Sequence, residues 1–379
     1  MVPYWSLFLQ HRGFNATEIG KLMAILLMTK LFAPNIWASV ADHLTAKNGS
    51  SLGLLKVASL ITVSIYCLMF FVDGFWPTAM VMLGFCLFWN ASLPQIEAAT
   101  LNHLKDRRDQ YGRIRLWGSV GFIVMVQGLG FVMDVVGPQA ILPAGAMALC
   151  SVFLASFLMR DKTAKPANKN TQQTADLKSK VSFLSLINKN VVFLFSLCVL
   201  MQVSHAPWHT FFSIYLEGYG YSKSSIGALW SIGVVFEIVV FIVGYRLLAH
   251  YRLATLLSFT FLIAAIRWCL VAKYPESGWL ILITQIMHSM TYGLYHSVMI
   301  KLIDRIFQGR YQIRGQALYG SVTFGLGGAI GSFFSGHIWT VIGHNELFMA
   351  AGILMFFVFL ISIMFTSKVI NNISRAAHK

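Results

Sequence analysis

Two stretches of this chain align with each other, residue for residue and without a gap. The first is PYWSLFLQHRGFNATEIGKLMAILLMTKLF, residues 3–32, and the second is TFFSIYLEGYGYSKSSIGALWSIGVVFEIV, residues 210–239. The aligned identities are Ser6/Ser213, Leu9/Leu216, Gly13/Gly220, Ile19/Ile226, Gly20/Gly227, Leu22/Leu229 and Ile25/Ile232. A weaker echo pairs IRLWGSV (114–120) with ALYGSV (317–322). A long internal repeat of this kind indicates that the chain is built from two parallel halves.

The composition is that of an all-α, polytopic membrane protein. Of the 379 residues, 57% are hydrophobic and 11% are charged, and the mean hydropathy is +0.67. A soluble globular protein carries about 25% charged residues. Apolar segments of roughly 20 residues, long enough to cross a ~30 Å hydrocarbon core, recur along the whole chain. We predict about eleven spans, at 17–40, 54–72, 78–98, 113–134, 139–159, 191–216, 224–248, 253–273, 278–302, 314–340 and 345–366.

The segment 160–190 differs from its apolar neighbours. It is polar and rich in Lys, Asn, Gln and Thr, which is typical of a linker. We therefore expect an N-terminal helical bundle over 1–159 and a C-terminal bundle over 191–379. Parallel six-helix halves with a cytoplasmic linker are the architecture of the major facilitator superfamily. A full span precedes the second copy of the repeat, whereas the first copy begins just after Met1, so we expect most of the first helix to be missing.

The basic residues follow membrane topology rather than a nucleic-acid surface. The net charge is +15, but most of the 29 Lys and Arg lie in alternate loops and the C-terminal tail. This positive-inside pattern assigns one set of segments to the cytoplasm: 42–56, 101–113, 160–190, 244–252, 301–315 and 366–379. We expect a monomer in a bacterial inner membrane with a cytoplasmic C-terminus, and no nucleic-acid partner.

Two charges stand at corresponding places in the repeat. Lys30 lies in the middle of the span 17–40, and the alignment puts Glu237 opposite it. An ionisable residue at mid-helix costs ~2.5–3.5 kcal/mol on insertion scales and normally faces the interior of the bundle. We therefore expect both side chains to face a central cavity, with a function there.

Other polar residues within the spans form two candidate groups. Glu97 and Arg115 lie near the facing ends of consecutive spans, where they either bind substrate or lock two helices together. Glu237, Arg267 and His288 lie in three successive spans and can converge. Such a cluster either exchanges a proton or forms a static buried ion pair. His296 shares a helix face with His288 by the 3.6-residue period.

The remaining motifs have plainer interpretations. His205 and His209 flank Pro207 at the spacing of a metal half-site, but no third ligand lies nearby, so we expect them to line the cavity at a kink. GLGGAIG (325–331) lies within a span, where small residues permit close helix packing. No G-x-S-x-G or H-E-x-x-H motif occurs, so we expect no enzyme, metal or cofactor. Several aromatic residues, including Trp208, Trp230 and Tyr292, are candidates to line a cavity for an aromatic or sugar-like ligand.

Several stretches resemble the 3-phenylpropionate permease group, which is related to the lactose permease type of proton symporter. They are IEAATLNHLKDRRDQYGRIRLWGSVG (96–121), HTFFSIYLEGYGYSKSSIGALWSIGVVFEIVVF (209–241), AIRWCLVA (265–272) and QIMHSMTYGLYHS (285–297). The resemblance implies that Glu97 and Arg115 correspond to the carboxylate–arginine pair at the permease sugar site. It also implies sugar-binding and proton-coupling roles for Glu237, Arg267 and His288. Lys30 stands where phenylpropionate permeases carry a basic residue and lactose permease does not.

The sequence departs from that pattern at two places. Lactose permease has a coupling glutamate three residues after the histidine, and Thr291 stands there in this chain. Either Glu237 or a histidine then takes the proton, or coupling is lost. The superfamily loop signature is degenerate over ASVADHLTAK (38–47), where Asp42 is its clear remnant.

These observations predict a proton-coupled symporter that imports a small organic acid, such as 3-phenylpropionate, by alternating access. The expected substrate residues are Lys30, Glu97, Arg115, Trp208, Trp230 and Tyr292, and the expected proton-coupling residues are Glu237, Arg267, His288 and His296. The choice of an acid as substrate rests on a count of charges within the spans. Three bases stand against two acids, and this surplus of one positive charge favours a monovalent anion if all five side chains line one cavity. A symporter for a neutral sugar or nucleoside, an exporter and a non-transporting membrane protein stay open as alternatives.

Overall fold

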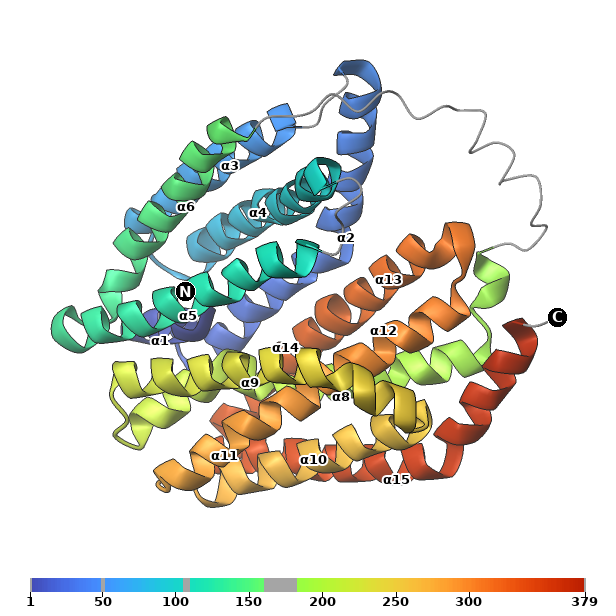
Figure 1. Cartoon of the computed structure of the whole chain (residues 1–379). Coiled ribbons are helices and arrows are strands. Elements are labelled where there is room, and N and C mark those ends of the chain that lie inside the picture. The colour runs from blue at the N-terminus through green and yellow to red at the C-terminus, as the bar shows by residue number, and fades with distance from the viewer. Residues whose placement is uncertain (1, 49–51, 105–109, 160–182, 378–379) are drawn as a thin grey trace.

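The structure, a computed structural model, describes residues 2–48, 52–104, 110–159 and 183–377. Its described residues form helices and no strands, which agrees with the predicted all-α class. The helices gather into two bundles, drawn from blue to green and from yellow-green to red in Figure 1. The first contains α1 (Val2–His11), α2 (Ala16–Asn48), α3 (Leu52–Cys67), α4 (Phe75–Leu104), α5 (Tyr111–Val136) and α6 (Ile141–Leu158).

The second bundle follows the predicted linker, of which residues 160–182 lie outside the described part of the chain. Its helices are α8 (Lys189–Gly218), α9 (Lys223–His250), α10 (Leu253–Lys273), α11 (Gly278–His288), α12 (Tyr295–Ile306), α13 (Gln312–Gly320), α14 (Gly328–Val341) and α15 (His344–Ala377). Two π-helical segments interrupt this series, η5 (Ser289–Leu294) between α11 and α12 and η7 (Ser321–Gly327) between α13 and α14. Short 3-10 turns are η1 (Leu68–Phe70), η3 (Pro138–Ala140), η4 (Leu184–Leu186) and η6 (Gly309–Tyr311).

Among the described residues, ten of the predicted spans correspond to helices that are long and apolar enough to cross a membrane. The remaining one, 278–302, is covered by α11, η5 and α12. Gln285, His288 and Thr291 interrupt its apolar sequence. Polar side chains in a span are costly and usually mark a functional path.

One end of the molecule is built from tight glycine turns. Because successive helices run in opposite directions, five glycines with φ between 80° and 128° come together there: Gly13, Gly74, Gly137, Gly220 and Gly343. Glycine takes positive φ without the steric cost that a Cβ brings. We call this the glycine-turn end, and the opposite end, from which the chain leaves α6 toward α8, the linker end.

The two bundles meet along α5 and α9 near the glycine-turn end. Asp134 of α5 accepts hydrogen bonds from the backbone N–H groups of Lys223 (2.7 Å) and Ser224 (3.0 Å), at the first turn of α9. Tyr4 Oη donates to the Lys223 carbonyl oxygen at 2.8 Å. Gly130 and Gly227 lie within this contact, where an added Cβ would come within 2.7 Å or less of atoms of the other half.

A second contact joins α2 to α14 at the same end. Gly20 and Gly336 face each other, so that a Cβ on Gly20 would lie 2.8 Å from the Gly336 Cα. The Thr17 hydroxyl lies 3.0 Å from that of Thr340. Toward the linker end, the last described hydrogen bond between the halves runs from Ser321 Oγ to the Lys30 carbonyl oxygen, at 3.5 Å. The halves are therefore held together at the glycine-turn end and at mid-depth.

The glycine-rich sequence 325–331 packs as predicted. Added Cβ atoms would crowd Leu31 of α2 at Gly325, Val199 of α8 at Gly327, and Ala206 of α8 at Gly331. The small residues thus let η7 and α14 approach α2 and α8 closely, which is the usual role of such residues between membrane helices.

Candidate substrate and proton site

Lys30 and Glu237 lie on α2 and α9, the helices that the repeat aligns. Both side chains are partly buried, and neither takes part in an ion pair among the described residues. Lys30 adjoins η7, because its carbonyl oxygen accepts from Ser321 Oγ at 3.5 Å. Glu237 packs against η5, where a Cβ on Gly293 would lie 3.2 Å from its Cγ. Tyr292 of η5 and Phe324 of η7 lie with ring centroids 6.0 Å apart, so the two charged residues adjoin segments that carry a pair of neighbouring rings.

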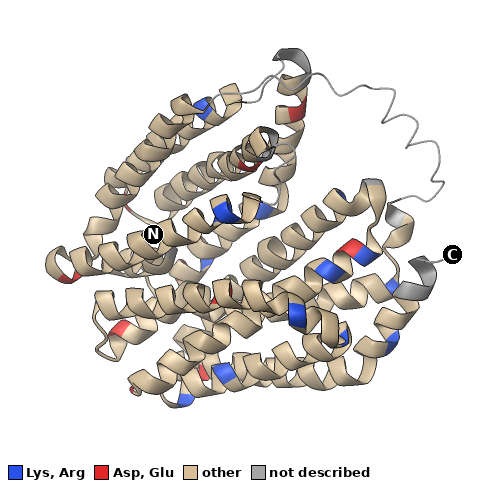
Figure 2. Cartoon of the chain, in the orientation of Figure 1, with Lys and Arg blue, Asp and Glu red and all other residues tan. Residues whose placement is uncertain are grey.

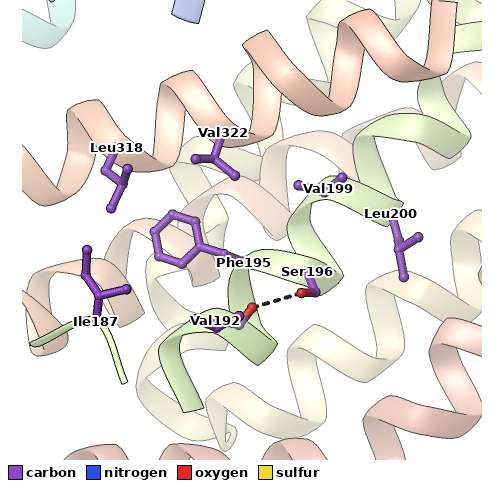
Figure 3. Close-up of a pocket in the computed structure, with 8 residues that line it drawn as sticks. All are labelled: Ile187, Val192, Phe195, Ser196, Val199, Leu200, Leu318 and Val322. Carbon is purple, nitrogen blue, oxygen red and sulfur yellow. Dashed lines mark hydrogen bonds between the residues drawn. The ribbon is translucent and has the colours of Figure 1, made fainter. Parts of the chain in front are cut away.

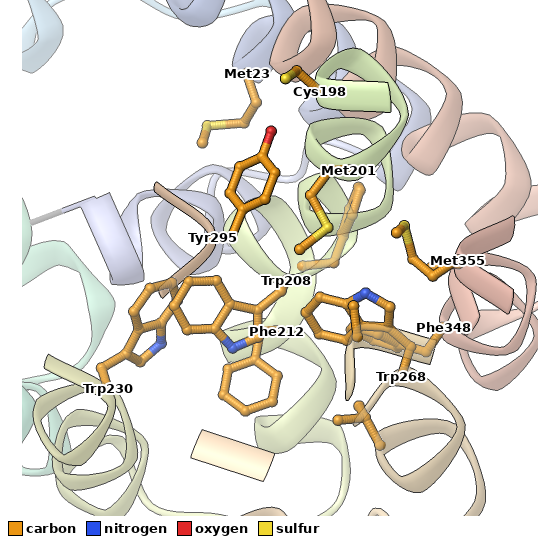
Figure 4. Packing of buried hydrophobic residues seen from close by; sticks show 14 of the residues in the cluster. Met23, Cys198, Met201, Trp208, Phe212, Trp230, Trp268, Tyr295, Phe348 and Met355 are labelled. Atoms are coloured by element: carbon orange, nitrogen blue, oxygen red, sulfur yellow. The ribbon is translucent and has the colours of Figure 1, made fainter. Parts of the chain in front are cut away.

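Those rings belong to a longer row within the second bundle. Trp230 and Trp208 lie with ring centroids 3.9 Å apart, and Trp208 stacks on His288 at 4.4 Å. His288 stacks in turn on Tyr292 at 5.2 Å. His209 meets Tyr292 edge-on at 6.3 Å. Figure 4 shows Trp230 and Trp208 side by side in the packed interior.

Arg267 is fully buried behind this row, with a side chain that is 0% exposed. Its Nε donates to the Thr284 carbonyl oxygen at 2.8 Å, and its Nη1 donates to Thr291 Oγ1 at 3.2 Å. The guanidinium lies 4.2 Å from the ring centroid of Trp268 and 5.1 Å from that of Trp208, within range of a cation–π interaction. Its Nη2 has no hydrogen-bond partner.

The interpretation of Glu237 and Arg267 as a static buried ion pair is wrong. Among the described residues, neither side chain lies within 4.0 Å of an opposite charge. The guanidinium is held by two acceptors on α11 and η5 and by two indole faces instead. Arg267 and His288 do meet at Trp208, whereas Glu237 packs beside the group at Gly293 of η5.

Glu97 and Arg115 form an ion pair. Arg115 Nη1 lies 2.7 Å from Glu97 Oε1, and Tyr111 Oη donates to the same oxygen at 3.4 Å. The pair lies toward the linker ends of α4 and α5, and the Arg115 side chain is 56% exposed. In Figure 2 the few charges on these helices stand out against long neutral stretches. The five charges of the sequence count therefore do not share one surface, because Arg267 is enclosed and this pair is open.

The remaining histidines have different settings. His205 does not line a cavity, because its ring is 1% exposed and its Nδ1 lies 2.9 Å from the Met201 carbonyl oxygen of its own helix. His296 lies 3.4 Å from Tyr319 Oη through its Nδ1. Tyr319 and His296 both lie near Phe324 of η7, which continues the row of rings beyond Tyr292.

Sequence reasoning did not identify the hydrogen bonds that hold this group. Gln285 Oε1 accepts from Trp208 Nε1 at 3.2 Å, and Ser213 Oγ accepts from Trp230 Nε1 at 3.2 Å. The Thr284 carbonyl oxygen and Thr291 Oγ1 accept hydrogen bonds from the Arg267 guanidinium. The sequence does show polar residues within the span 278–302, among them Gln285, His288 and Thr291. They indicate the helix involved but not which side chains they bind.

A separate cavity of about 450 Å³ lies beside α8 near the linker end. Figure 3 shows its lining of aliphatic side chains with Phe195. Its one polar side chain, Ser196, already donates to the Val192 carbonyl oxygen at 3.0 Å. This cavity offers no free polar partner to a charged solute, so the group around Lys30, Glu237 and Arg267 is the better candidate site.

Comparison with known proteins places the chain in a family. The MFS_1-like family matches residues 1–350. The chain belongs to this family. It is 30% identical to the "Probable 3-phenylpropionic acid transporter" of Escherichia coli (strain K12), across 92% of the chain and 89% of that relative. It is 25% identical to a maltose permease of Geobacillus stearothermophilus, across 89% and 83%.

Solved structures agree on the fold. A mutant form of the nucleoside transporter NupG matches with a TM-score of 0.81 at 14% identity, covering 96% of this chain and 94% of that one. At this identity the likeness concerns the fold alone. Together with the family, it identifies the chain as a multi-pass secondary transporter of the major facilitator type and not an enzyme.

Proposed function

We propose that this protein is a proton-coupled symporter that imports a monovalent aromatic carboxylate such as 3-phenylpropionate. The observation that carries the proposal is an imbalance of charge. Glu97 and Arg115 neutralise each other, whereas Lys30 and Arg267 have no acidic partner and Glu237 has no basic partner among the described residues. Unpaired charges in a membrane interior are costly and usually serve a substrate or ion.

The imbalance suits an anion carried together with a proton. With the histidines neutral and Glu237 ionised, the empty site holds one surplus positive charge. Protonation of Glu237 raises the surplus to two, and one bound carboxylate returns it to one. The empty and the fully loaded site thus carry the same net charge. Equal charge keeps the electrostatic cost of moving the halves similar in both forms, which favours symport over uncoupled passage.

The ring of the substrate also has a suitable neighbourhood. The Tyr292 ring meets the rings of His209 at 6.3 Å and Phe324 at 6.0 Å, beside the segments that Lys30 and Glu237 adjoin. A carboxylate bound at Lys30 would bring an attached phenyl group toward these rings, where aromatic contacts are worth about 0.5–1.5 kcal/mol beyond area burial. The name of the Escherichia coli relative points to the same class of substrate.

The proposed cycle is a rocking of the two halves about the central site. The basic loops at the linker end support a cytoplasmic location for that end and for the C-terminus, in a bacterial inner membrane. Contacts at the glycine-turn end then correspond to the form closed toward the outside. The protein works as a monomer, because each molecule contains both halves.

The test is uptake of labelled 3-phenylpropionate into cells that express the protein, with and without an uncoupler. We expect uncoupler-sensitive accumulation that Glu237→Gln abolishes. We expect Lys30→Ala to raise the KM about tenfold, because it removes a charge-assisted contact to the carboxylate. Glu276→Gln, at an exposed position between α10 and α11, is the matched control and should leave uptake unchanged. Uptake that ignores both the uncoupler and Glu237→Gln would refute proton coupling.

The second candidate is a symporter for a neutral sugar or nucleoside. The row of stacked rings favours it, because aromatic faces also bind sugars and bases. Competition by neutral sugars or nucleosides, with no competition by aromatic acids and normal transport by Lys30→Ala, would favour this candidate. Uptake into inverted vesicles in place of cells would indicate export.

A further inference from the structure

The helix that carries His288 is broken at the point where it passes the candidate site. η5, six residues of π-helix from Ser289 to Leu294, separates α11 from α12. π-helical segments are rare and occur frequently at functional sites, since their extra residue disturbs the regular ladder of backbone hydrogen bonds. η5 supplies Tyr292 to the row of rings and Gly293 to the contact with Glu237. Its conformation therefore decides how these groups lie.

A single hydroxyl joins η5 to two buried basic side chains. Thr291 Oγ1 accepts from Arg267 Nη1 of α10 at 3.2 Å and lies 3.3 Å from His205 Nε2 of α8. All three side chains are buried, at 0–1% exposure. Arg267 Nε also donates to the Thr284 carbonyl oxygen, so the guanidinium spans the start of the broken region from α11 to η5.

The Thr291 hydroxyl joins several groups at one atom. Its oxygen accepts from Arg267 Nη1. It donates to the His288 carbonyl oxygen at 3.3 Å and lies at the same distance from His205 Nε2. His205 Nδ1 in turn lies 2.9 Å from the Met201 carbonyl oxygen, which can only accept. Thr291 therefore links Arg267 and His205 to the backbone of His288, and it is the member of this group that η5 contributes.

We propose that Thr291 is a positioning residue for transport. Its hydroxyl fixes η5 to Arg267 and His205, and thereby holds His288 and Tyr292 beside Glu237. Arg267 then serves as a strut for the broken helix and not as a counter-ion. The inference rests on the proposed function, in that Glu237 is taken as the proton carrier. Without the hydroxyl, a second guanidinium N–H group would join Nη2 in lacking a partner, and the unpaired cation would pull η5 out of place.

The experiment compares three substitutions in the full-length protein. Thr291→Val removes the hydroxyl at nearly constant volume, and Thr291→Ser keeps it. Thr260→Val is the matched control, because Thr260 is also fully buried but its hydroxyl donates only to Leu257 of its own helix, at 2.7 Å. The two measurements are the initial rate of 3-phenylpropionate uptake and hydrogen–deuterium exchange of peptides that cover residues 285–296.

We expect Thr291→Val to lower the uptake rate about tenfold, the effect of losing one hydrogen bond to a charged group, and to speed exchange in 285–296. Thr291→Ser should restore both measurements, and Thr260→Val should alter neither. If Thr291→Val behaves like Thr260→Val in hydrogen exchange, or if Thr291→Ser fails to restore it, the positioning role is refuted.

Two additions to the experiment allow a conclusion even if Thr291→Val does not fold or the substrate is wrong. His205→Leu removes the imidazole contact without altering Thr291, and it should speed exchange in the same peptides even if Thr291→Val does not fold. Unchanged exchange in His205→Leu would overturn the proposed link through His205. If the unaltered protein does not transport 3-phenylpropionate, the proposed function fails on its own, while hydrogen exchange still decides the role of Thr291.

Discussion

The α2–α14 and α5–α9 contacts between the halves are related by the internal repeat, yet they use different chemistry. Gly20 of α2 and Gly227 of α9 are aligned positions, and each lets its helix approach the other half closely. At α2 the approach is completed by hydroxyls, those of Thr17 and Thr340. At α9 it is completed by a carboxylate, because Asp134 holds the backbone N–H groups of Lys223 and Ser224.

This difference shows that the two copies of the repeat share the glycine at the backbone contact, whereas the polar contact beside it differs. Close backbone contact depends on glycine, since any Cβ would collide with atoms of the other half, and glycine stands at both aligned positions. The polar contact beside it is adjustable. A carboxylate at a helix N-terminus gains from the macrodipole and from charge-assisted hydrogen bonds, whereas a hydroxyl gains from neither. We therefore expect the α5–α9 contact to release under ionic conditions that leave the α2–α14 contact intact.

The largest effect is expected at the backbone contact of α2. In Gly20→Ala the new Cβ would lie 2.7 Å from the Ser332 carbonyl oxygen and 2.8 Å from the Gly336 Cα, and these backbone atoms cannot rotate away. Overpacking of this kind costs about 1–3 kcal/mol, so the halves should separate at the glycine-turn end. Distances between spin labels at the exposed residues Phe71 and Trp279, one in each half, report the opening.

The control for this substitution is Gly118→Ala on α5, where an added Cβ has no neighbour within 4 Å. It should leave the distance distribution unchanged. An unchanged distribution in Gly20→Ala as well would show that the α2–α14 contact does not hold the halves together.

A smaller effect is expected for the carboxylate. Asp134→Asn removes the charge that binds the first turn of α9, and should increase the population of the separated form about threefold, because solvent screens this exposed group. The same spin-label pair measures it, at low and at high salt. The effect should shrink at high salt, since screening already weakens the native contact.

Asp73→Asn is the control for Asp134→Asn. Asp73 lies at the same end, but its 3.5 Å contact with Arg12 stays within one half. If both substitutions open the molecule equally, general surface charge and not the α9 contact is responsible.

The smallest effect is expected for Thr17→Val. It removes the contacts to Thr340 Oγ1 (3.0 Å) and the Gly336 carbonyl oxygen (3.4 Å), which are neutral and partly open to solvent. We expect a change below about 1 kcal/mol, less than that of Asp134→Asn. A larger opening in Thr17→Val than in Asp134→Asn would reverse the proposed order of the two contacts.

Much of the fold follows from the sequence because apolar length and repeat register are local properties. The predicted spans match helices, and the register pairs Lys30 with Glu237 on helices that both pack against the opposite half. The glycine-rich sequence 325–331 was also correctly assigned to packing.

The site was less predictable because its contacts depend on distances between helices. Nothing local reveals that Arg267 lies between two indoles, or that its acceptors come from Thr284 and Thr291 in place of Glu237. The π-helical segments are equally hidden, because an extra residue in a turn is tolerated only where tertiary contacts compensate for it. The charged residues could be predicted from the sequence, whereas the polar contacts that orient them were found only in the structure.

The burial of Arg267 also bears on how the protein is made. During synthesis α10 must enter the membrane with a permanent charge near its centre, at a cost of ~2.5–3.5 kcal/mol that its apolar neighbours offset. Trp208 has already been made by then, but Thr284 and Thr291 lie 17 and 24 residues further along the chain. We therefore expect the guanidinium to lack these hydrogen-bond acceptors until residues 284–291 have been synthesised, so that the second bundle completes its packing only after that segment is made.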